Sequence, residues 1–477
     1  MQLSALFRQM GGDGADLYKF IQKESRSDVV NEAVKQLIPD LHKVADRGLR
    51  PDKIIFVPSG ELDPITKQPI MQMDTAPVTR APLSIQKYII SQKGSFARGN
   101  GIVMKPTIEK SVVYDNVYRN WVNNKTDFDI KEFATRQMGE TQCAVIFYGD
   151  RGIDKLSDFN FKYKIVSPLK GDTLYPFFDE DTDDLIAFGR EYKRGRKVRY
   201  DLYAMDPTTK RCIIRRFENK KPLQVEVLGE DGTTPTGETQ DLVIATPYTK
   251  LPIVYWEQDE GECNDTAEII NELEAGFSDF LTGLGYTADP ILFAKGTVMN
   301  LPAKGTQGKF IESTDPAADL KYITPDNATE ARELQFKMLQ RYIFSLNRAV
   351  LLDLDTMKDL GSAPSGAAFE RYLTDAYMEA TDRQQGSWGK GVQRMVNWMV
   401  SQWALLLNDT SGIRIDVKFT KYSLVDEQER VTLAMTANGG LPVVDLETSV
   451  GMAGLVDNVQ ATVIKIRDEQ APATTQV

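Results

Sequence analysis

The segments 264-NDTAEIINELEAGFSDFLTGLG-285 and 327-NATEARELQFKMLQRYIFSLNRAV-350 decide the fold, because each predicts one long amphipathic helix. Apolar residues recur at steps of three and four in both segments, as one buried face of an α-helix requires. They are Ile269, Ile270, Leu273, Phe277, Phe280, Leu281 and Leu284 in the first segment, and Leu334, Met338, Leu339, Tyr342, Ile343, Leu346 and Val350 in the second. Asp289-Pro290 ends the first helix, so the two helices flank an excursion at 289–326.

The residues that follow, 351-LLDLDTMKDLGSAPSG-366, are too polar and too interrupted for a buried element and predict a loop. A third helix is expected from about Ser365 to Leu406. We expect it to bend at Gly386 or at 389–391, because glycine weakens a helix interior.

Length and composition place broad limits on the protein. A chain of 477 residues suggests about three domains. Its formal net charge of -11 argues against a protein that coats nucleic acid generally, although it leaves local contacts with DNA open. No signal-peptide pattern and no membrane-spanning run is present, so we expect a protein made in a reducing compartment.

Helical and extended patterns are segregated along the chain and predict an α+β fold. Helices are expected over much of 1–48, 83–93 and 115–138, and later at 426–436 and 456–468. Pro58-Ser59-Gly60 and Asp63-Pro64 predict a crossing rich in turns. Between about 143 and 256, short apolar runs separated by turn residues predict an antiparallel β insertion, and 413–419 predicts one more strand.

Patterns of catalysis and cofactor binding are weak throughout, and we expect no enzyme, no cofactor and no metal site. The single histidine, His42, lies in a helical pattern and is better explained as a packed or solvent-facing residue than as a catalyst. Gly305–Phe310 lacks the spacing of a phosphate-binding loop. Three cysteines, at 143, 212 and 263, show no spacing typical of zinc or a disulfide framework.

Two charged segments leave alternatives open. Asp179–Asp184 begins like a calcium loop, but Asp184 replaces the required glycine, so an acidic turn is the better interpretation. The basic segment 190–221 interleaves arginine and lysine with tyrosine. It is typical either of the charged outer face of antiparallel strands or of a surface that contacts phosphates.

Four passages, in this order and spacing, resemble the portal proteins of tailed bacteriophages, in particular the siphophage portal family. They are 83–103 with its glycine-marked turn, 264–296, the Gly-Ser step at 360–368, and 419–458. The resemblance implies a portal fold with the following divisions: a wing at 1–263, stem helices at 264–288 and 327–352, a clip at 289–326, a tunnel loop at 353–364, a long kinked wing helix at 365–409, and a strand, crown helices and tail at 410–477.

The resemblance also implies a function. Portal proteins form a ring, usually of twelve subunits, at one capsid vertex, and double-stranded DNA passes through it during packaging and ejection. Implied partners are the terminase large subunit, a head–tail connector or adaptor, and the major capsid and scaffolding proteins, with no membrane. The protein would be part of the virion and assembled in the host cytoplasm. The alternatives are a metal-dependent enzyme of nucleic-acid processing that uses 179–184, and a monomeric structural adaptor.

Site residues follow from the same placement. The stem stripes are too apolar for one chain's two helices to bury, so neighbouring subunits are expected to complete them through Ile270, Phe277, Leu339 and Leu346. Lys304 and Lys309 are expected to dock partners on the clip. The residues expected at the DNA are Asp353, Asp355, Lys358, Asp359 and Gly361 in the tunnel loop, with Ser365 and Gly366 at the step into the long helix.

Overall fold

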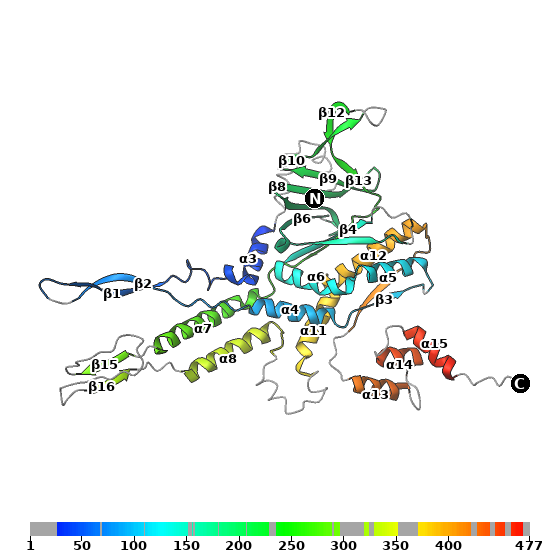
Figure 1. Cartoon of the computed structure of the whole chain (residues 1–477). Coiled ribbons are helices and arrows are strands. Elements are labelled where there is room, and N and C mark those ends of the chain that lie inside the picture. Colours follow the sequence, from blue (N-terminus) through cyan, green and yellow to red (C-terminus); the bar gives the residue numbers. More distant parts are fainter. Residues whose placement is uncertain are drawn as a thin grey trace.

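A computed structural model of the chain is shown in Figure 1. It describes residues 26–66, 69–108, 110–150, 155, 158–179, 181–206, 208–228, 235–288, 291–295, 319–323, 329–351, 371–420, 427–438, 444–453 and 459–470. The described residues mix helices and strands, as the α+β prediction requires.

Helices and strands alternate along the described chain, and the longest run of strands extends from β4 to β14. The described α-helices are α3 (Ser27–Leu37), α4 (Ile85–Arg98), α5 (Val112–Asn123), α6 (Thr126–Glu140), α7 (Ala267–Ala288), α8 (Thr329–Leu346), α11 (Thr374–Gln385), α12 (Ser387–Leu407), α13 (Glu427–Asn438), α14 (Leu446–Ala453) and α15 (Val459–Gln470). Short 3₁₀ turns are η1 (Pro39–Leu41), η3 (Pro168–Lys170) and η4 (Asn264–Thr266). The described strands are β1 (Lys53–Leu62), β2 (Pro69–Ala76), β3 (Ile102–Pro106), β4 (Gln142–Gly149), β5 (Phe161–Val166), β6 (Asp172–Phe178), β7 (Leu185–Arg194), β8 (Lys197–Met205), β9 (Cys212–Glu218), β10 (Lys221–Pro222), β11 (Gln224–Leu228), β12 (Pro235–Asp241), β13 (Val243–Ala245), β14 (Ile253–Glu257), β15 (Ile291–Lys295), β16 (Asp319–Ile323) and β17 (Ile415–Phe419).

Strand β4 is the centre of the body. It pairs with β14 and β5 in a three-stranded antiparallel sheet, and Cys143 to Phe147 are buried without interruption. Successive side chains of a strand point to opposite faces. Cys143, Val145 and Phe147 accordingly join the core under α5, α6 and α12, while Ala144 and Ile146 join a second core. Burial on both faces explains why this strand is an unbroken apolar run.

The second core lies between that sheet and a larger antiparallel sheet in the order β10-β9-β8-β7-β6, with β13 also paired to β9. The larger sheet carries a third cluster of buried side chains, which includes Tyr200 and Phe217. The predicted antiparallel β insertion is therefore confirmed as two stacked sheets and the separate hairpin β11–β12, which form the upper part of Figure 1.

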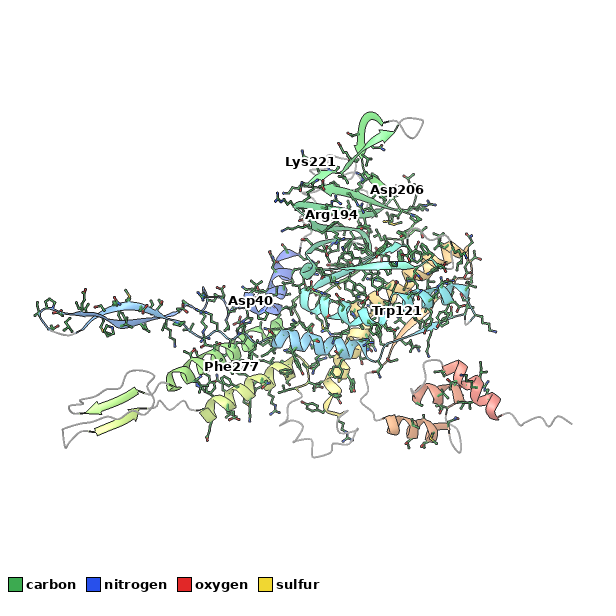
Figure 2. The ribbon with its side chains drawn as sticks, viewed as in Figure 1. Asp40, Trp121, Arg194, Asp206, Lys221 and Phe277 are labelled. Carbon is green, nitrogen blue, oxygen red and sulfur yellow. The ribbon has the colours of Figure 1, made fainter. Side chains whose placement is uncertain are left out.

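Helix α12 packs its buried face against the core that holds Cys143, Val145 and Phe147. Trp388, Trp398 and Trp403 are buried along it, and the Trp256 indole nitrogen of β14 donates to the Trp388 carbonyl at 3.0 Å. Figure 2 shows Trp121 within this packed body, while Phe277 lies in a helix pair outside it. No described helix is long and apolar enough to cross a membrane.

Two structures project from the body to the same side (Figure 1). One is the pair α7 and α8, which pack against each other. The other is the β1–β2 hairpin, here called the arm. In this view α7 lies between the arm and α8, and the strands β15 and β16 lie at the free end of the helix pair. The C-terminal helices α13, α14 and α15 pack against one another.

Several sequence predictions of local structure are confirmed. The two amphipathic helices are present as α7 and α8, and the third helix breaks at Gly386, which ends α11 and begins α12. The predicted strand at 413–419 is present as β17.

Other predictions of local structure are wrong. The supposed crossing at 58–64 is mostly strand β1 of the arm, with its register shift between Pro58 and Leu62 and Gly60 at φ +86°. The helix predicted at 115–138 is two helices, because Lys125 adopts φ +53° between them. The helical prediction for 42–48 fails, since α3 ends at Leu37 and only the short η1 follows.

A glycine in α12 provides a test of the body's packing. An alanine at Gly391 would place its Cβ 1.9 Å from the Trp256 indole nitrogen, inside a fully packed core. We expect Gly391→Ala to lower the free energy of unfolding by about 3 kcal/mol, measured by urea denaturation. Gly283→Ala is the matched control, because this α7 glycine has nothing within 4 Å of the added carbon. The control should be about 0.5–1 kcal/mol more stable through helix propensity, and equal stability of both variants would contradict the packing.

Candidate functional site

The helix pair is held together by an apolar cluster of its own. Ile89 of α4, Ile270 of α7 and Ile343 of α8 are fully buried in this cluster. Farther out, the Phe277 and Phe336 rings meet edge to face at 6.2 Å between centroids. The inner stripes of α7 and α8 are thus buried within one chain, and α4 contributes the third wall.

A different face of α8 is apolar and exposed. Leu334, Met338, Tyr342 and Leu346 are between 43 and 63% exposed. They are spaced four residues apart, so they form one line about 18 Å long on the helix surface. We call this line the α8 row. Lines of large exposed apolar side chains are typical of surfaces that another molecule covers.

Helix α7 is fixed to the body by a ladder of hydrogen bonds along its other side. The segment 77–84, which follows the arm, runs antiparallel to α7. Every second backbone N–H donates to a side chain of α7, and each acceptor lies four residues closer to the N-terminus of the helix than the one before. The rungs are Thr79 N–H to Thr282 Oγ1 at 3.3 Å, Ala81 N–H to Ser278 Oγ at 3.0 Å and Leu83 N–H to Glu274 Oε1 at 2.6 Å. Two extended residues and four helical residues both advance by about 6 Å, which is why the rungs match.

The base of the arm is attached to α7 by ion pairs as well. Arg50 binds Asp279 at 2.6 Å, and Arg80 binds Asp52 at 2.9 Å across the two ends of the arm. His42 Nδ1 lies 2.7 Å from Glu274 Oε2, and both side chains are buried. His42 is therefore a packed residue, as the non-catalytic interpretation required, although it follows a 3₁₀ turn and not an α-helix.

A buried carboxylate joins the root of the helix pair to the body. Glu262, just before α7, accepts from Lys93 Nζ of α4 at 2.5 Å and from Arg383 of α11. Arg383 also binds Glu379 at 2.8 Å. Burial opposes the charge of Glu262, but the nearby Arg383 and Lys93 outweigh it and hold the pKa of Glu262 below its ordinary value.

The acidic segment 179–184 forms the turn between β6 and β7. The Asp179 carboxylate accepts the backbone N–H of Asp181 at 3.0 Å, as in an ordinary Asx turn. No group of three histidine, cysteine or acidic residues suited to a metal ion occurs in the described part of the chain. Nothing in this turn favours the alternative of a metal-dependent enzyme.

Four basic side chains of the segment 190–221 form ion pairs with carboxylates of the same sheet. Lys197 and Arg199 bind Glu218, Arg216 binds Asp201 at 3.2 Å, and Arg190 binds Asp172 at 2.6 Å. Burial raises the pKa of Asp201 despite the adjacent Arg216. These contacts support the interpretation of 190–221 as charged strands of an antiparallel sheet.

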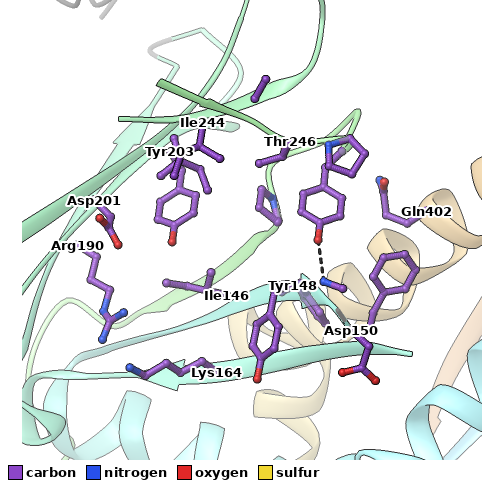
Figure 3. A pocket seen from close by; sticks show the side chains of 18 of the residues that line it. Ile146, Tyr148, Asp150, Lys164, Arg190, Asp201, Tyr203, Ile244, Thr246 and Gln402 are labelled. Carbon is purple, nitrogen blue, oxygen red and sulfur yellow. Dashed lines mark hydrogen bonds between the residues drawn. The ribbon is translucent and has the colours of Figure 1, made fainter. Parts of the chain in front are cut away.

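A cavity of about 560 Å³ lies between these strands, β4 and α12 (Figure 3). Arg190 and Asp201 line one end, and Thr246 and Gln402 line the other. Thr246 Oγ1 donates to the Cys212 carbonyl and the Tyr248 hydroxyl accepts from Gly149 N–H, so both hydroxyls serve the fold. The lining shows no pair of nucleophile and base.

The three cysteines are free and buried. Burial raises the pKa of Cys212 and of Cys263 to about 12, and raises that of Cys143 further. A thiol with so high a pKa is protonated and unreactive at neutral pH. This agrees with the prediction of idle, packed cysteines.

The predicted site residues fall into three groups. Ile270 is fully buried in its own chain, which corrects its assignment to a contact between subunits. Phe277 and Leu339 are partly buried against the same cluster, and Leu346 is exposed in the α8 row. The others, Lys304, Lys309, Asp353, Asp355, Lys358, Asp359, Gly361, Ser365 and Gly366, lie outside the described residues.

Sequence reasoning missed the ladder on α7, although a signal was present. Glu274, Ser278 and Thr282 form a polar row at four-residue spacing beside the apolar stripe of α7, and the first two of these side chains are fully buried. A buried polar row requires hydrogen-bonding partners, and the segment 77–84 supplies them.

Comparison with known proteins adds one finding. The model of the family described as phage portal protein, SPP1 Gp6-like, matches residues 64–476. No curated protein matches the chain. The matched region includes the helix pair, the α8 row and almost all of the body.

The ladder predicts a specific loss of stability. Ser278→Ala removes the acceptor of the Ala81 N–H at a position that is fully buried. An unsatisfied buried donor costs about 1–2 kcal/mol, which should appear as a lower midpoint of urea unfolding. Ser345→Ala is the control, because Ser345 is exposed on α8 and its replacement should leave the midpoint nearly unchanged. Similar midpoints for both variants would show that the ladder contributes nothing.

Proposed function

This chain belongs to the SPP1 Gp6-like family of phage portal proteins, and we propose that its copies form a closed ring of twelve subunits that conducts DNA during genome packaging and ejection. As a portal protein it is a structural component of the virion at the capsid vertex. Its proposed partners are double-stranded DNA, the terminase large subunit, a head–tail connector, and the capsid and scaffolding proteins.

The α8 row is the observation that carries the ring. Within one chain the α7–α8 cluster is already complete, yet Leu334, Met338, Tyr342 and Leu346 remain exposed. Burying a large apolar side chain contributes roughly 1.5–3 kcal/mol, so a neighbour that covers the row gains substantial free energy. The interface proposed here therefore uses the outer face of α8 around Leu346, and not Ile270.

The same proposal assigns a role to each region. The body within 1–263 and the helix at 365–409 form the wing, α7 and α8 form the stem, and 289–326 forms the clip between them. Lys304 and Lys309 of the clip dock the terminase and later the connector. Residues 353–364 form the tunnel loop, and 410–477 form the crown.

A substitution in the α8 row tests the ring. Leu346→Asp places a charge within the proposed contact, at the C-terminal end of the α8 row, where an unpaired buried carboxylate costs several kcal/mol, so rings should not form. Because Leu346 is exposed in one chain, the monomer should remain folded, with unchanged circular dichroism. Light scattering and negative-stain microscopy measure assembly.

The matched control is Ser345→Asp, which adds the same charge to an exposed position on the neighbouring face of α8. This variant should form rings with a central hole like the parent. A parent protein that is folded but monomeric at micromolar concentration would refute the proposed function.

The tunnel loop yields a second test. Asp353, Asp355 and Asp359 repel phosphate, whereas Lys358 offers one weak attraction per subunit, of order 1 kcal/mol or less. We expect Lys358→Ala to assemble normally but to change the rate of packaging or the retention of DNA, as measured by nuclease protection of packaged genomes. Deletion of 356–359 should have a stronger effect. If rings that carry the deletion package and retain full-length DNA like the parent, the loop only connects two helices.

A further inference from the structure

We propose that the arm of one subunit packs its apolar face onto the α8 row of the next subunit. This proposal rests on the ring described above and specifies which surfaces meet in it. The contact is head to tail, so each chain contributes its arm on one side and its α8 row on the other.

The arm has one apolar face that nothing in its own chain covers. In the β1–β2 register Phe56 is opposite Met73, and Pro58 is opposite Met71. Residues directly opposite in an antiparallel pair share a face, so Ile54, Phe56, Met71 and Met73 lie together. These four side chains are between 52 and 72% exposed. The other face pairs Val57 with Gln72 and Ile55 with Asp74, and its two apolar side chains are only half-exposed.

A hairpin of this kind needs a covering surface. Two strands alone are marginally stable in water and gain stability when they pack on a helix or on further strands. The arm spans about 30 Å by the rise of a ten-residue strand. The α8 row spans about 18 Å, so the arm is long enough to cover all of it.

The direction of the arm is set by its base. The hydrogen-bond ladder and the Arg50–Asp279 ion pair fix both ends of the arm to α7. The arm and α8 project to the same side of the body, and α7 separates them in Figure 1. Both apolar faces are exposed in the single chain, so the arm does not cover its own α8 row.

Ring closure requires the pairing of two unlike surfaces. Each subunit of a cyclic ring of more than two members presents one surface to the preceding subunit and a different one to the next. The arm and the α8 row satisfy this requirement, since they are both apolar, are both elongated and flank the same helix. A second copy of the chain is therefore the occupant that the geometry favours for both faces.

Cysteine cross-linking tests the contact directly. The described native thiols are buried and protonated, so introduced cysteines dominate the reaction. Rings of the double variant Phe56→Cys with Met338→Cys, treated with a short bis-maleimide, should yield a ladder of covalent oligomers on a denaturing gel. Gln72→Cys with Met338→Cys is the matched control, because Gln72 lies on the opposite face of the same arm. It should yield monomers.

Co-expression of two differently tagged single variants, Phe56→Cys and Met338→Cys, should give cross-linked dimers that carry both tags, which proves a contact between chains. Rings seen by microscopy that give no ladder, or give equal ladders for Phe56 and Gln72, would overturn the arm contact and leave the ring intact. If the cysteine of Phe56→Cys reacts readily with a maleimide in these rings, the apolar face of the arm is exposed there, which would assign that face to another protein of the vertex. Failure of the parent to form rings refutes the proposed function itself.

Discussion

The buried carboxylate of Glu262 is the constraint on which the placement of the projecting elements depends. Three segments distant in sequence meet there: α4 through Lys93, the turn before α7, and α11 through Arg383. Glu262 and Lys93 are nearly inaccessible to water, so the loss of either partner would leave a buried charge without compensation. Because α7 begins a few residues later, this cluster fixes where the helix pair leaves the body. The ladder from 77–84 then fixes the arm along α7. The position of Glu262 therefore determines where both proposed contact surfaces, the α8 row and the arm, lie relative to the body.

Apolar burial is distributed unevenly over the chain. In the body, β4 sends alternate side chains into two cores, and α12 closes one of them with tryptophans that are nearly all fully covered. The helix pair buries one face and exposes another, whereas no described side chain of the arm is buried. A protein that functioned alone would gain by replacing the exposed leucine, methionine and phenylalanine side chains with polar ones. The body is thus packed by its own contacts, and the exposed apolar side chains of the projecting parts support the proposed association between subunits.

The sequence predicted those parts of the fold that depend on local periodicity. Apolar steps of three and four located α7 and α8, Gly386 located the break between α11 and α12, and the unbroken run at 143–148 located β4. It failed where long-range pairing overrides local preference. Pro58 and Gly60 favour turns, yet β2 draws them into a hairpin whose register shift accommodates them. Lys125 separates α5 from α6 in a left-handed conformation, although neither glycine nor proline occurs at this break. Ile270 was predicted at a contact between subunits but is buried within its own chain, since periodicity identifies an apolar stripe without showing whether α4 already covers it.

The charges of the β insertion fit a conduit better than a DNA clamp. A ring through which DNA slides must not hold phosphates tightly, because each retained lysine or arginine contact adds to the force needed for movement. Segment 190–221 has the composition of a phosphate-binding surface, yet Arg190, Arg199 and Arg216 are each occupied by a carboxylate of the same sheet. Releasing such an arginine to a phosphate would expose the charge of Asp172, Glu218 or Asp201 beside the anion. The net charge of -11 acts in the same direction over the whole chain. These three paired arginines therefore attract phosphate only weakly, as the proposed DNA conduit requires.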